Sequence, residues 1–442
     1  MPEFLTLLPP SESLDKLLRN LPDPKPATET INTDSALGRI TATDLRAPHA
    51  LPEFPRSTVD GFAVKATDTY GASDSLPAYL NLIGECPMGA APELEITSTT
   101  TAIIHTGGML PKGADAVVMM EYTQMVHHGE HEEHREKLNK EKNSVRSVNS
   151  VVNPEIEILR AVADGENVIR IGEDVAKDAL IKPKGSAIRP AEVGGLMALG
   201  FTQVEVAQHP KIGIISSGDE VVHPSKRPQP GQVRDINSYT LSTLVEKYGG
   251  EPIVYGIVAD SLDAMKIAIS RSLNECEMVL ITAGSSASAR DMTAAAIDEL
   301  GEPGVLVHGV NTRPGKPTIL GVCDGKAVIG LPGNPVSALV NGYVFVAPLV
   351  KRLLGQPEAK WQASISAKLM VNIPSQAGRE DWIPIRLTTK DTKKHEDISF
   401  EANPIFGKSN LIFTMVSADG LLKIPADATG LSAGEMVEVI LV

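Results

Sequence analysis

The sequence predicts a multidomain protein in which an α/β domain, built on a parallel sheet, is joined to β-rich domains. Two observations lead to this expectation. Between residues 190 and 355, short apolar runs alternate with amphipathic helical segments, the pattern of a parallel sheet with helices on both faces. On both sides of this region, short β-type runs are separated by Gly, Pro and Asp clusters. The 442 residues are enough for about two to four domains.

Within the α/β region, the strands are the apolar runs KIGIISSG, EPIVYGIV, MVLITAG, VLVHGV, TILGV and AVIGL. Asn237 or Ser238 is expected to cap the first helix, Ser261 the second and Asp291 the third, because short polar side chains accept hydrogen bonds from free helix N–H groups. A long apolar helix is expected from Val336 to Leu354. Ligands of such sheets bind at the carboxyl ends of the strands.

The remaining chain divides into three further predicted regions. Residues 1–50 and 151–189 form a discontinuous N-terminal or linker domain, with one helix near Ser11–Asn20 and a second near Thr33–Leu37 that ends at Gly38. Residues 51–150 form a β-rich domain. Residues 356–442 form a small C-terminal β domain that resembles a barrel.

The β-rich domain is interrupted by a charged insertion, residues 127–150, which has almost no large apolar side chain. It holds His127, His128, His131 and His134, and on a helix three of these would share one face at metal-ligand spacing. Nothing apolar would support such a helix, however. A solvated loop is therefore the preferred interpretation.

Composition excludes several classes of function. The net charge of −14 opposes binding to nucleic acid or to anionic lipid. Cys86, Cys276 and Cys323 are far apart and form no CxxC pair, so neither a disulfide framework nor a cysteine zinc site is expected. The start MPEFLTLLPP lacks the positive region of a signal peptide, and we found no apolar run approaching the ~18 residues of a membrane span. A cytoplasmic protein is expected.

Small polar residues gather where the predicted strands end. Backbone N–H groups that small residues leave accessible, next to a helix start, suit a phosphate. Three carboxylates follow neighbouring strands, Glu220, Asp260 and Asp291, and such oxygen ligands suit Mg²⁺. The alternative is that Asp291 only caps its helix and that Glu220 is a surface residue. The candidate phosphate-binding residues are Ser217, Gly218, Gly284, Ser285 and Ser286.

Two loops rich in Pro and Gly add further candidates. The loop RPGKP (313–317) carries two cations on a rigid turn, which suits an oxyanion. The loop LPGNPVS (331–337) opens the long helix and offers polar side chains that can donate to a bound anion. Each loop could also be an ordinary turn. Their candidate binding residues are Arg313, Pro314, Gly315, Lys316, Pro332, Gly333, Asn334, Pro335 and Ser337.

These residues belong to motifs that span nearly the whole chain: RSTVDGFAV (56–64), HTGGMLPKGADAVVMME (105–121), IGEDV (171–175), SSGDE (216–220), RPGKP (313–317), LPGNPVSA (331–338) and GKSN…SADGL (407–421). In this order the motifs resemble those of the molybdopterin molybdenumtransferases, which include bacterial MoeA, the plant insertase domain and the E domain of gephyrin.

The resemblance implies an elongated homodimer whose α/β domain binds a pterin and whose active site is composite, with the β domain of one subunit facing the α/β domain of the other. It implies that adenylated molybdopterin and molybdate are substrates, and that Mg²⁺-dependent cleavage releases AMP as the metal enters the dithiolene. Contacts with other cofactor-biosynthesis proteins are also expected. The matching functional positions are Asp60, Thr106, Asp174, Glu220, Asp260, Asp291, Pro332, Pro335, Ser409 and, less directly, Arg379 in GRED.

The sequence departs from the family pattern in three places. AGSSASARD replaces the usual GGxSxG, which shifts phosphate contacts toward the Ser285 and Ser286 hydroxyls. Arg313 replaces a common Lys, and the 127–150 insertion is additional. The choice between molybdenum and tungsten and the enzyme that receives the cofactor stay open. Two alternatives also stay open: a molybdopterin adenylyltransferase, disfavoured by the extra domains, and a non-catalytic scaffold, disfavoured by the acidic strand ends.

Overall fold

The computed structural model describes residues 7–126, 154–283, 287–357, 363–389 and 400–442. The chain divides into two compact units. The first, called the main unit here, comprises Met1–Thr43, Pro183–Leu196 and Phe201–Val442, and the second unit comprises Asp44–Lys182 and Met197–Gly200. The histidine-rich insertion lies outside the described residues, as do Gly284, Ser285 and Ser286.

The main unit is built on a mixed sheet with the strand order β16-β13-β17-β21-β20-β18. Strands β16, β13, β17 and β21 are parallel, whereas β20 is antiparallel to both β21 and β18. The expected parallel sheet is therefore confirmed for these four strands, whereas β20 and β18 extend it in antiparallel pairs. The bounds are β13 Lys211–Ser217, β16 Glu251–Val258, β17 Met278–Ala283, β18 Pro303–His308, β20 Ile319–Cys323 and β21 Lys326–Pro332.

The reversal of β20 has a local cause, the dipeptide Asp324-Gly325. Both residues have positive φ, 49° and 82°. Residues Cys323 and Lys326 on either side of the dipeptide are paired. An Asp-Gly pair with positive φ at both positions makes a two-residue hairpin, which can join only antiparallel strands.

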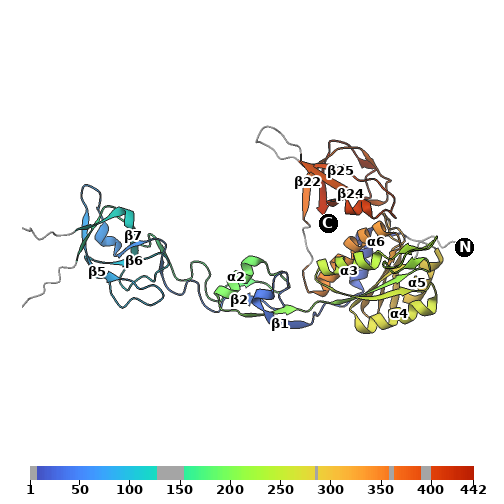
Figure 1. Ribbon diagram of the computed structural model, residues 1–442, viewed down its shortest axis with the longest axis horizontal. Helices are drawn as coiled ribbons and strands as arrows, with labels where there is room; N and C mark the ends of the chain where they lie inside the picture. The colour runs from blue at the N-terminus through green and yellow to red at the C-terminus, as the bar shows by residue number, and fades with distance from the viewer. Residues whose placement is uncertain (1–6, 127–153, 284–286, 358–362, 390–399) are drawn as a thin grey trace, which may run out of the picture. The chain divides into compact units, whose positions relative to one another are not determined.

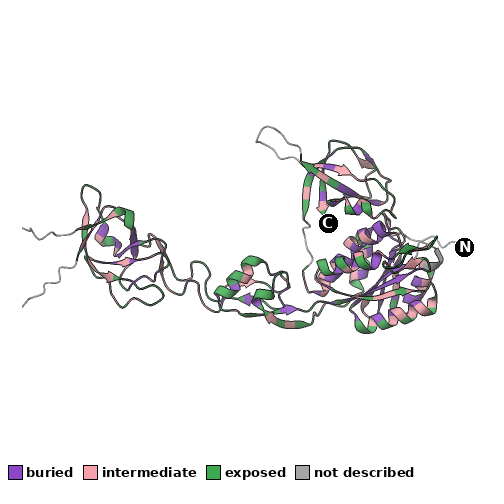
Figure 2. Ribbon diagram, viewed as in Figure 1, coloured by how far each residue is buried: buried purple, intermediate pink, exposed green. Residues whose placement is uncertain are grey.

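Helices cover both faces of this sheet (Figure 1). Ile214 and Leu280 share one hydrophobic core with α3 and α6, while Ile215 and Ile281 share the core on the opposite face with α4 and α5. Alternate residues of a strand point to opposite faces, so each central strand contributes to both cores. In Figure 2 the strands are largely buried and the helices expose their outer sides. The helices are α1 Pro10–Arg19, α3 Asn237–Lys247, α4 Leu262–Glu275, α5 Ala287–Leu300, α6 Pro335–Asn341 and α7 Ala347–Leu353.

One predicted helix cap is confirmed and two are wrong. The side chain of Ser261 accepts a hydrogen bond from the backbone N–H of Ala264 at 3.3 Å. Helix α3 already begins at Asn237, and Asp235 accepts from the N–H of Ser238 at 3.1 Å. Asp291 lies inside α5, which begins at Ala287, so it caps nothing.

The predicted long apolar helix is a continuous run, Pro335–Leu353, in which α6 and α7 are joined by a π-helical turn, Gly342–Val346. By length and composition this run could cross a membrane, which corrects the expectation that no segment comes close. Its most apolar stretch is 61% buried, and Phe345 and Val346 pack in the main core. It is therefore the core helix of the main unit.

The C-terminal part forms a closed barrel, as predicted. Its strands follow the order β24-β25-β22-β28-β26, and β26 pairs back with β24. The short strand β19, Thr312–Arg313, joins β24 in parallel, which ties the barrel to the α/β sheet. The other bounds are β22 Ser364–Leu369, β23 Ile373–Pro374, β24 Glu380–Thr389, β25 Phe400–Pro404, α8 Phe413–Val416, β26 Gly420–Ile424, β27 Gly430–Leu431 and β28 Met436–Leu441.

The second unit contains a sheet in the order β7-β4-β6-β5-β9-β8, in which β9 pairs with both β5 and β8. Near the N-terminus of the chain, a one-turn 3₁₀ helix, Thr33–Ser35, replaces the expected second helix. The four-region division at residues 50, 150, 189 and 355 stays a prediction. The remaining elements of the two units have the bounds β1 Thr28–Asn32, β2 Leu45–Arg46, β3 Arg56–Ser57, β4 Gly61–Val64, β5 Ala78–Glu85, β6 Thr100–Ile104, β7 Ala116–Met119, β8 Thr123–Val126, β9 Glu155–Ile158, β10 Val168–Ile169, β11 Leu180–Lys182, α2 Pro190–Ala198, β12 Gln203–Ala207, β14 Val221–Val222 and β15 Val233–Arg234.

Candidate functional site

A cavity of about 620 Å³ lies where β13, β17 and β21 end, and we call it the strand-end cavity. These strands are adjacent and parallel, so the residues that follow them meet at one edge of the sheet. Ser217, Thr282 and Asn334 come from the three strand ends, and Arg234, Asp235 and Asn237 come from the segment before and at the start of α3. Of the predicted residues, Ser217, Glu220, Gly333, Asn334 and Pro335 line this cavity.

Two polar atoms in the wall of the strand-end cavity are buried and have no hydrogen-bond partner among the described residues. They are the hydroxyl oxygen of Ser217 and the carboxamide oxygen of Asn237. The amide nitrogen of Asn237 is already fixed, because it donates to the carbonyl of Gly333 at 2.9 Å. A buried polar atom without a partner costs about 1–3 kcal/mol. A polar ligand in this cavity would satisfy both atoms.

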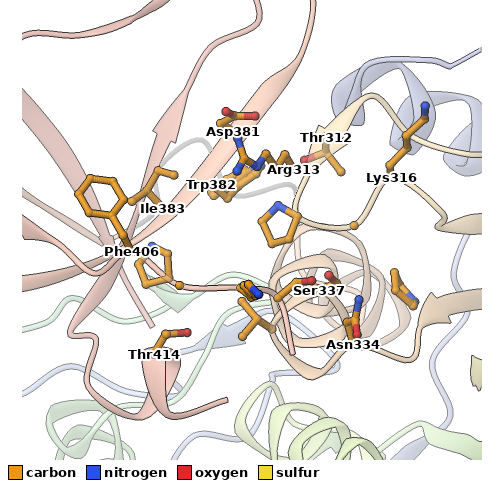
Figure 3. Close-up of a pocket in the computed structure, with 18 of the residues that line it drawn as sticks. Thr312, Arg313, Lys316, Asn334, Ser337, Asp381, Trp382, Ile383, Phe406 and Thr414 are labelled. Carbon is orange, nitrogen blue, oxygen red and sulfur yellow. The ribbon is translucent and has the colours of Figure 1, made fainter. Parts of the chain in front are cut away.

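A larger cavity, of about 840 Å³, lies between the 313–317 loop, the start of α6 and the barrel (Figure 3). Four basic residues line it, and Asp381 is the acidic side chain among its lining residues. We call it the cationic cavity. Its basic residues are Arg313, Lys316, Arg379 and Lys408. Among the other predicted residues, Pro314, Gly315, Pro332, Asn334, Ser337 and Ser409 also line it.

Arg379 is held in place by Asp381 through two bonds, Nε to Oδ1 at 2.7 Å and Nη2 to Oδ2 at 3.1 Å. Asp381 is only 1% exposed, and Ser375 donates to it at 3.0 Å. A bidentate pair of this kind fixes the guanidinium plane. Nη1 of Arg379 then stays available to a ligand in the cavity. Within the described ranges, Arg313 and Lys408 form no ion pair, so the cavity keeps a positive charge.

The 313–317 loop is attached to α6 through Asn341. The Asn341 amide nitrogen donates to the carbonyl of Pro314 at 3.2 Å and to that of Ser337 at 2.8 Å. Gly315 has φ +112°, and a Cβ there would lie 1.7 Å from that nitrogen. Only glycine therefore fits, which explains the Gly of RPGKP.

The barrel completes the cationic cavity by docking on the start of α6. The backbone N–H of Val336 donates to the carbonyl of Ser409 at 3.0 Å. Val336 and Val340 also share a hydrophobic cluster with Trp382, Met415 and Leu421.

The two cavities share part of their walls. Asn334 and Asn410 line both of them. Along the 332–337 loop, Gly333 and Pro335 face the strand-end cavity, while Pro332, Val336 and Ser337 face the cationic one. Ligands bound in the two cavities would therefore be neighbours.

The three carboxylates proposed for Mg²⁺ do not form a ready-made site. Glu220 is exposed beside the strand-end cavity, and Asp291 is exposed on α5. Asp260 has a buried carboxylate oxygen that no residue in the described part of the chain contacts by a hydrogen bond. Within the described part of the chain, no group of three or more His, Cys, Asp or Glu side chains is placed to hold a metal ion.

In the second unit, Asp60 and Thr106 lie in direct contact. Asp60 accepts hydrogen bonds from the backbone N–H of Thr106 at 2.7 Å and from its hydroxyl at 3.2 Å. His105 lies between two carboxylates, with Nε2 2.9 Å from Glu85 and Nδ1 3.7 Å from Asp60. Asp174 is exposed, and its backbone N–H donates to Leu51.

This arrangement moves two pKa values in opposite directions. The backbone N–H of Thr106 lowers the pKa of Asp60, and the hydroxyl of Thr106 and the charge of His105 lower it further. The hydrogen bond to Glu85 raises the pKa of His105, and the charges of Glu85 and Asp60 add to that effect. An ionised Asp60 beside a protonated His105 is thereby favoured.

Among the lining residues that sequence reasoning missed are Arg234, Asn237, Lys408 and Asn410. Lys408 and Asn410 flank Ser409 within the GKSN motif, so a signal was present. Arg234 and Asn237 stand in an ordinary segment before and at the start of α3, where nothing in the sequence marks them as ligand-facing.

Comparison with known proteins agrees with this architecture. Residues 8–200 match the MoeA N-terminal region (domain I and II), residues 213–352 a probable molybdopterin binding domain, and residues 366–442 the MoeA C-terminal region (domain IV). A Methanocaldococcus jannaschii protein named for molybdopterin biosynthesis is 34% identical over 97% of this chain and 95% of its own length. The chain belongs to the MoeA family.

Other members of the MoeA family match along the same length. The molybdopterin molybdenumtransferase of Haemophilus influenzae is 29% identical over 97% of both chains. The crystal structure of the molybdopterin biosynthesis MoeA protein from Pyrococcus horikoshii OT3 has a TM-score of 0.80 at 31% identity, and the alignment covers 99% of this chain and 100% of that one. The similarity therefore extends over nearly the whole chain.

Proposed function

We propose that this MoeA-family protein is a molybdopterin molybdenumtransferase, which inserts molybdate or tungstate into adenylated molybdopterin and releases AMP. The observation that carries the proposal is the wall shared by the two cavities at Asn334 and Asn410. Insertion requires an oxyanion and a phosphorylated pterin to lie side by side. Relatives named molybdopterin molybdenumtransferase match almost the full chain, which supports the same activity.

The chemistry of each cavity suits one of the two substrates. Ser217 and Asn237 in the strand-end cavity offer unpartnered polar atoms to the pterin and its phosphates. Arg313, Lys316 and Arg379 give the other cavity the charge and the N–H donors that an oxyanion needs. The hydroxyl groups of Ser337 and Ser409 would add neutral donors to that oxyanion.

The proposed reaction balances without an oxidant or a reductant. Water adds across the P–O–P bond of the adenylated substrate, which yields AMP and molybdopterin. Molybdate then forms two bonds to the dithiolene sulfurs, and one of its oxygens leaves as water with the two thiol protons. Molybdenum keeps its oxidation state, so these residues need only bind, orient and neutralise charge.

Mg²⁺, when bound, would neutralise the pyrophosphate as it is cleaved. The preformed three-carboxylate site that the sequence suggested does not fit the observed geometry. A site completed by substrate fits better, because Mg²⁺ usually binds one or two carboxylates together with substrate phosphates. Asp260, with its unpartnered oxygen, and Glu220 would supply those carboxylates. Asp291 would contact the substrate from its position in α5.

Asp60, Thr106 and Asp174 belong to the second unit, and we propose that they serve the reaction across a homodimer. In this arrangement each active site takes its two cavities from one chain and Asp60 from the other. A two-fold dimer would then contain two identical composite sites.

The deciding experiment supplies purified protein with adenylated molybdopterin, Mg²⁺ and molybdate, and measures AMP and dithiolene-bound molybdenum. An insertase produces both together. An adenylyltransferase would instead consume ATP and molybdopterin, and a scaffold would release no AMP. Ser337→Ala should reduce product formation at subsaturating molybdate.

A further inference from the structure

Asn410 occupies a fixed position at the boundary between the two cavities. The segment that carries it makes a turn in which the N–H of Leu411 donates to the carbonyl of Lys408 at 3.0 Å. The neighbouring carbonyl of Ser409 accepts from Val336 at the start of α6 at 3.0 Å. The backbone on either side of Asn410 is therefore tied to the loop that separates the cavities.

The side chain of Asn410 is free to bind ligands. It is exposed, and no described residue forms a hydrogen bond with its carboxamide. Asn334, the other residue shared by both cavities, is half-buried, and its carboxamide likewise forms no hydrogen bond with a described residue. By contrast, the amide nitrogens of Asn341 and Asn237 already donate to neighbouring backbone carbonyls.

A carboxamide suits this boundary because it is neutral and carries both donors and an acceptor. Its NH₂ group can donate to an oxyanion on one side, and its oxygen can accept a hydrogen bond from a thiol on the other. A carboxylate in the same place would repel both anionic substrates. An apolar side chain would offer neither bond.

We propose that Asn410 is a positioning residue that holds the oxyanion at the boundary and so couples AMP release to metal insertion. This inference rests on the proposed function. With Asn410 in place, the oxyanion lies within reach of the dithiolene when the pyrophosphate is cleaved. Without it, cleavage continues but the metal is transferred less often.

The test compares the full-length wild type with Asn410→Ala, Asn410→Asp and the control Asn403→Ala. Asn403 belongs to β25 of the same barrel, but it bonds to Thr388 at 3.0 Å and lines neither cavity. Two quantities are measured: dithiolene-bound molybdenum per AMP released, and the affinity for tungstate alone by titration calorimetry, which requires no turnover.

We expect Asn410→Ala to lower molybdenum inserted per AMP several-fold while AMP release continues. Asn410→Asp should weaken tungstate binding about tenfold, as one added like charge near a surface site does. Asn403→Ala should change neither quantity. An unchanged molybdenum-to-AMP ratio in Asn410→Ala would overturn the inference. If the wild type releases no AMP, the proposed function fails instead. In that case, unchanged tungstate affinity in Asn410→Asp would show separately that Asn410 does not hold the oxyanion.

Discussion

Thr106 binds the Asp60 carboxylate twice, through its backbone N–H at 2.7 Å and through its hydroxyl at 3.2 Å. Thr106→Val removes only the longer of these bonds. We therefore expect Thr106→Val to reduce AMP release by only about three- to tenfold, whereas Asp60→Asn, which removes the charge, should reduce it about a hundredfold. Both residues are exposed, so the melting temperature of each variant should stay near that of the wild type. Equal losses in the two variants would contradict this ranking.

The pair of His105 and Glu85 should make this site sensitive to pH. Glu85 raises the pKa of His105, so the imidazole stays protonated to a higher pH than an ordinary histidine. Its ion pairs with Glu85 and Asp60 form while both carboxylates are ionised and the imidazole is protonated, and they are lost as pH rises through that raised pKa. Glu85→Gln should return the pKa of His105 toward its usual value. Histidine NMR titration of the full chain, with His105→Gln to assign the signal, measures the change, and an unshifted titration would refute the pairing.

The anchor between Gly315 and Asn341 should be intolerant of a methyl group. In Gly315→Ala, the new Cβ meets the Asn341 amide and the residue must also keep a positive φ. We expect the free energy of unfolding to fall by about 1–3 kcal/mol and tungstate binding to weaken. Gly71→Ala is the matched control, because Gly71 has φ +86° with nothing within 4 Å of a built Cβ. If both variants lose the same free energy of unfolding, backbone strain alone explains the loss, and the contact with the Asn341 amide contributes nothing.

A shared active site predicts rescue between two inactive variants, Asp60→Ala and Asp291→Ala. If each site takes these residues from different chains, a heterodimer contains one intact site. Random subunit exchange makes about half of the dimers heterodimers, so roughly a quarter of all sites should recover. AMP release after mixing measures this recovery. The absence of recovery, with exchange verified by mass spectrometry, would place both residues in the same chain's site.

Much of the fold could be predicted because local rules determined it. Apolar runs bounded by turn residues located the strands of the α/β sheet, and Ser261 capped the helix it was expected to cap. The reversal of β20 was also readable, since Asp324-Gly325 is a strong hairpin signal. Asp291 was misplaced because α5 begins four residues earlier, at Ala287, in a stretch of small residues where sequence alone sets no clear helix start.

Residues of the candidate site could be predicted where they lie at the ends of strands in one sheet. Residues that the barrel brings to the site could not. Ser217 and Asn334 follow strands of one sheet, so topology alone brings them together. Asn410 reaches the same place only because the barrel docks on α6 through Val336 and Trp382. Such docking depends on packing between segments distant in sequence, and no local pattern encodes it.

The central claim is that an oxyanion binds in the cationic cavity beside the strand-end cavity. Anomalous diffraction from crystals soaked in tungstate tests it most directly, because tungsten scatters strongly and its position is seen without inference. We predict one strong peak within hydrogen-bonding reach of Arg313, Arg379 and Ser337, which disappears in Arg379→Ala. A peak inside the strand-end cavity, or none at saturating tungstate, would contradict the account.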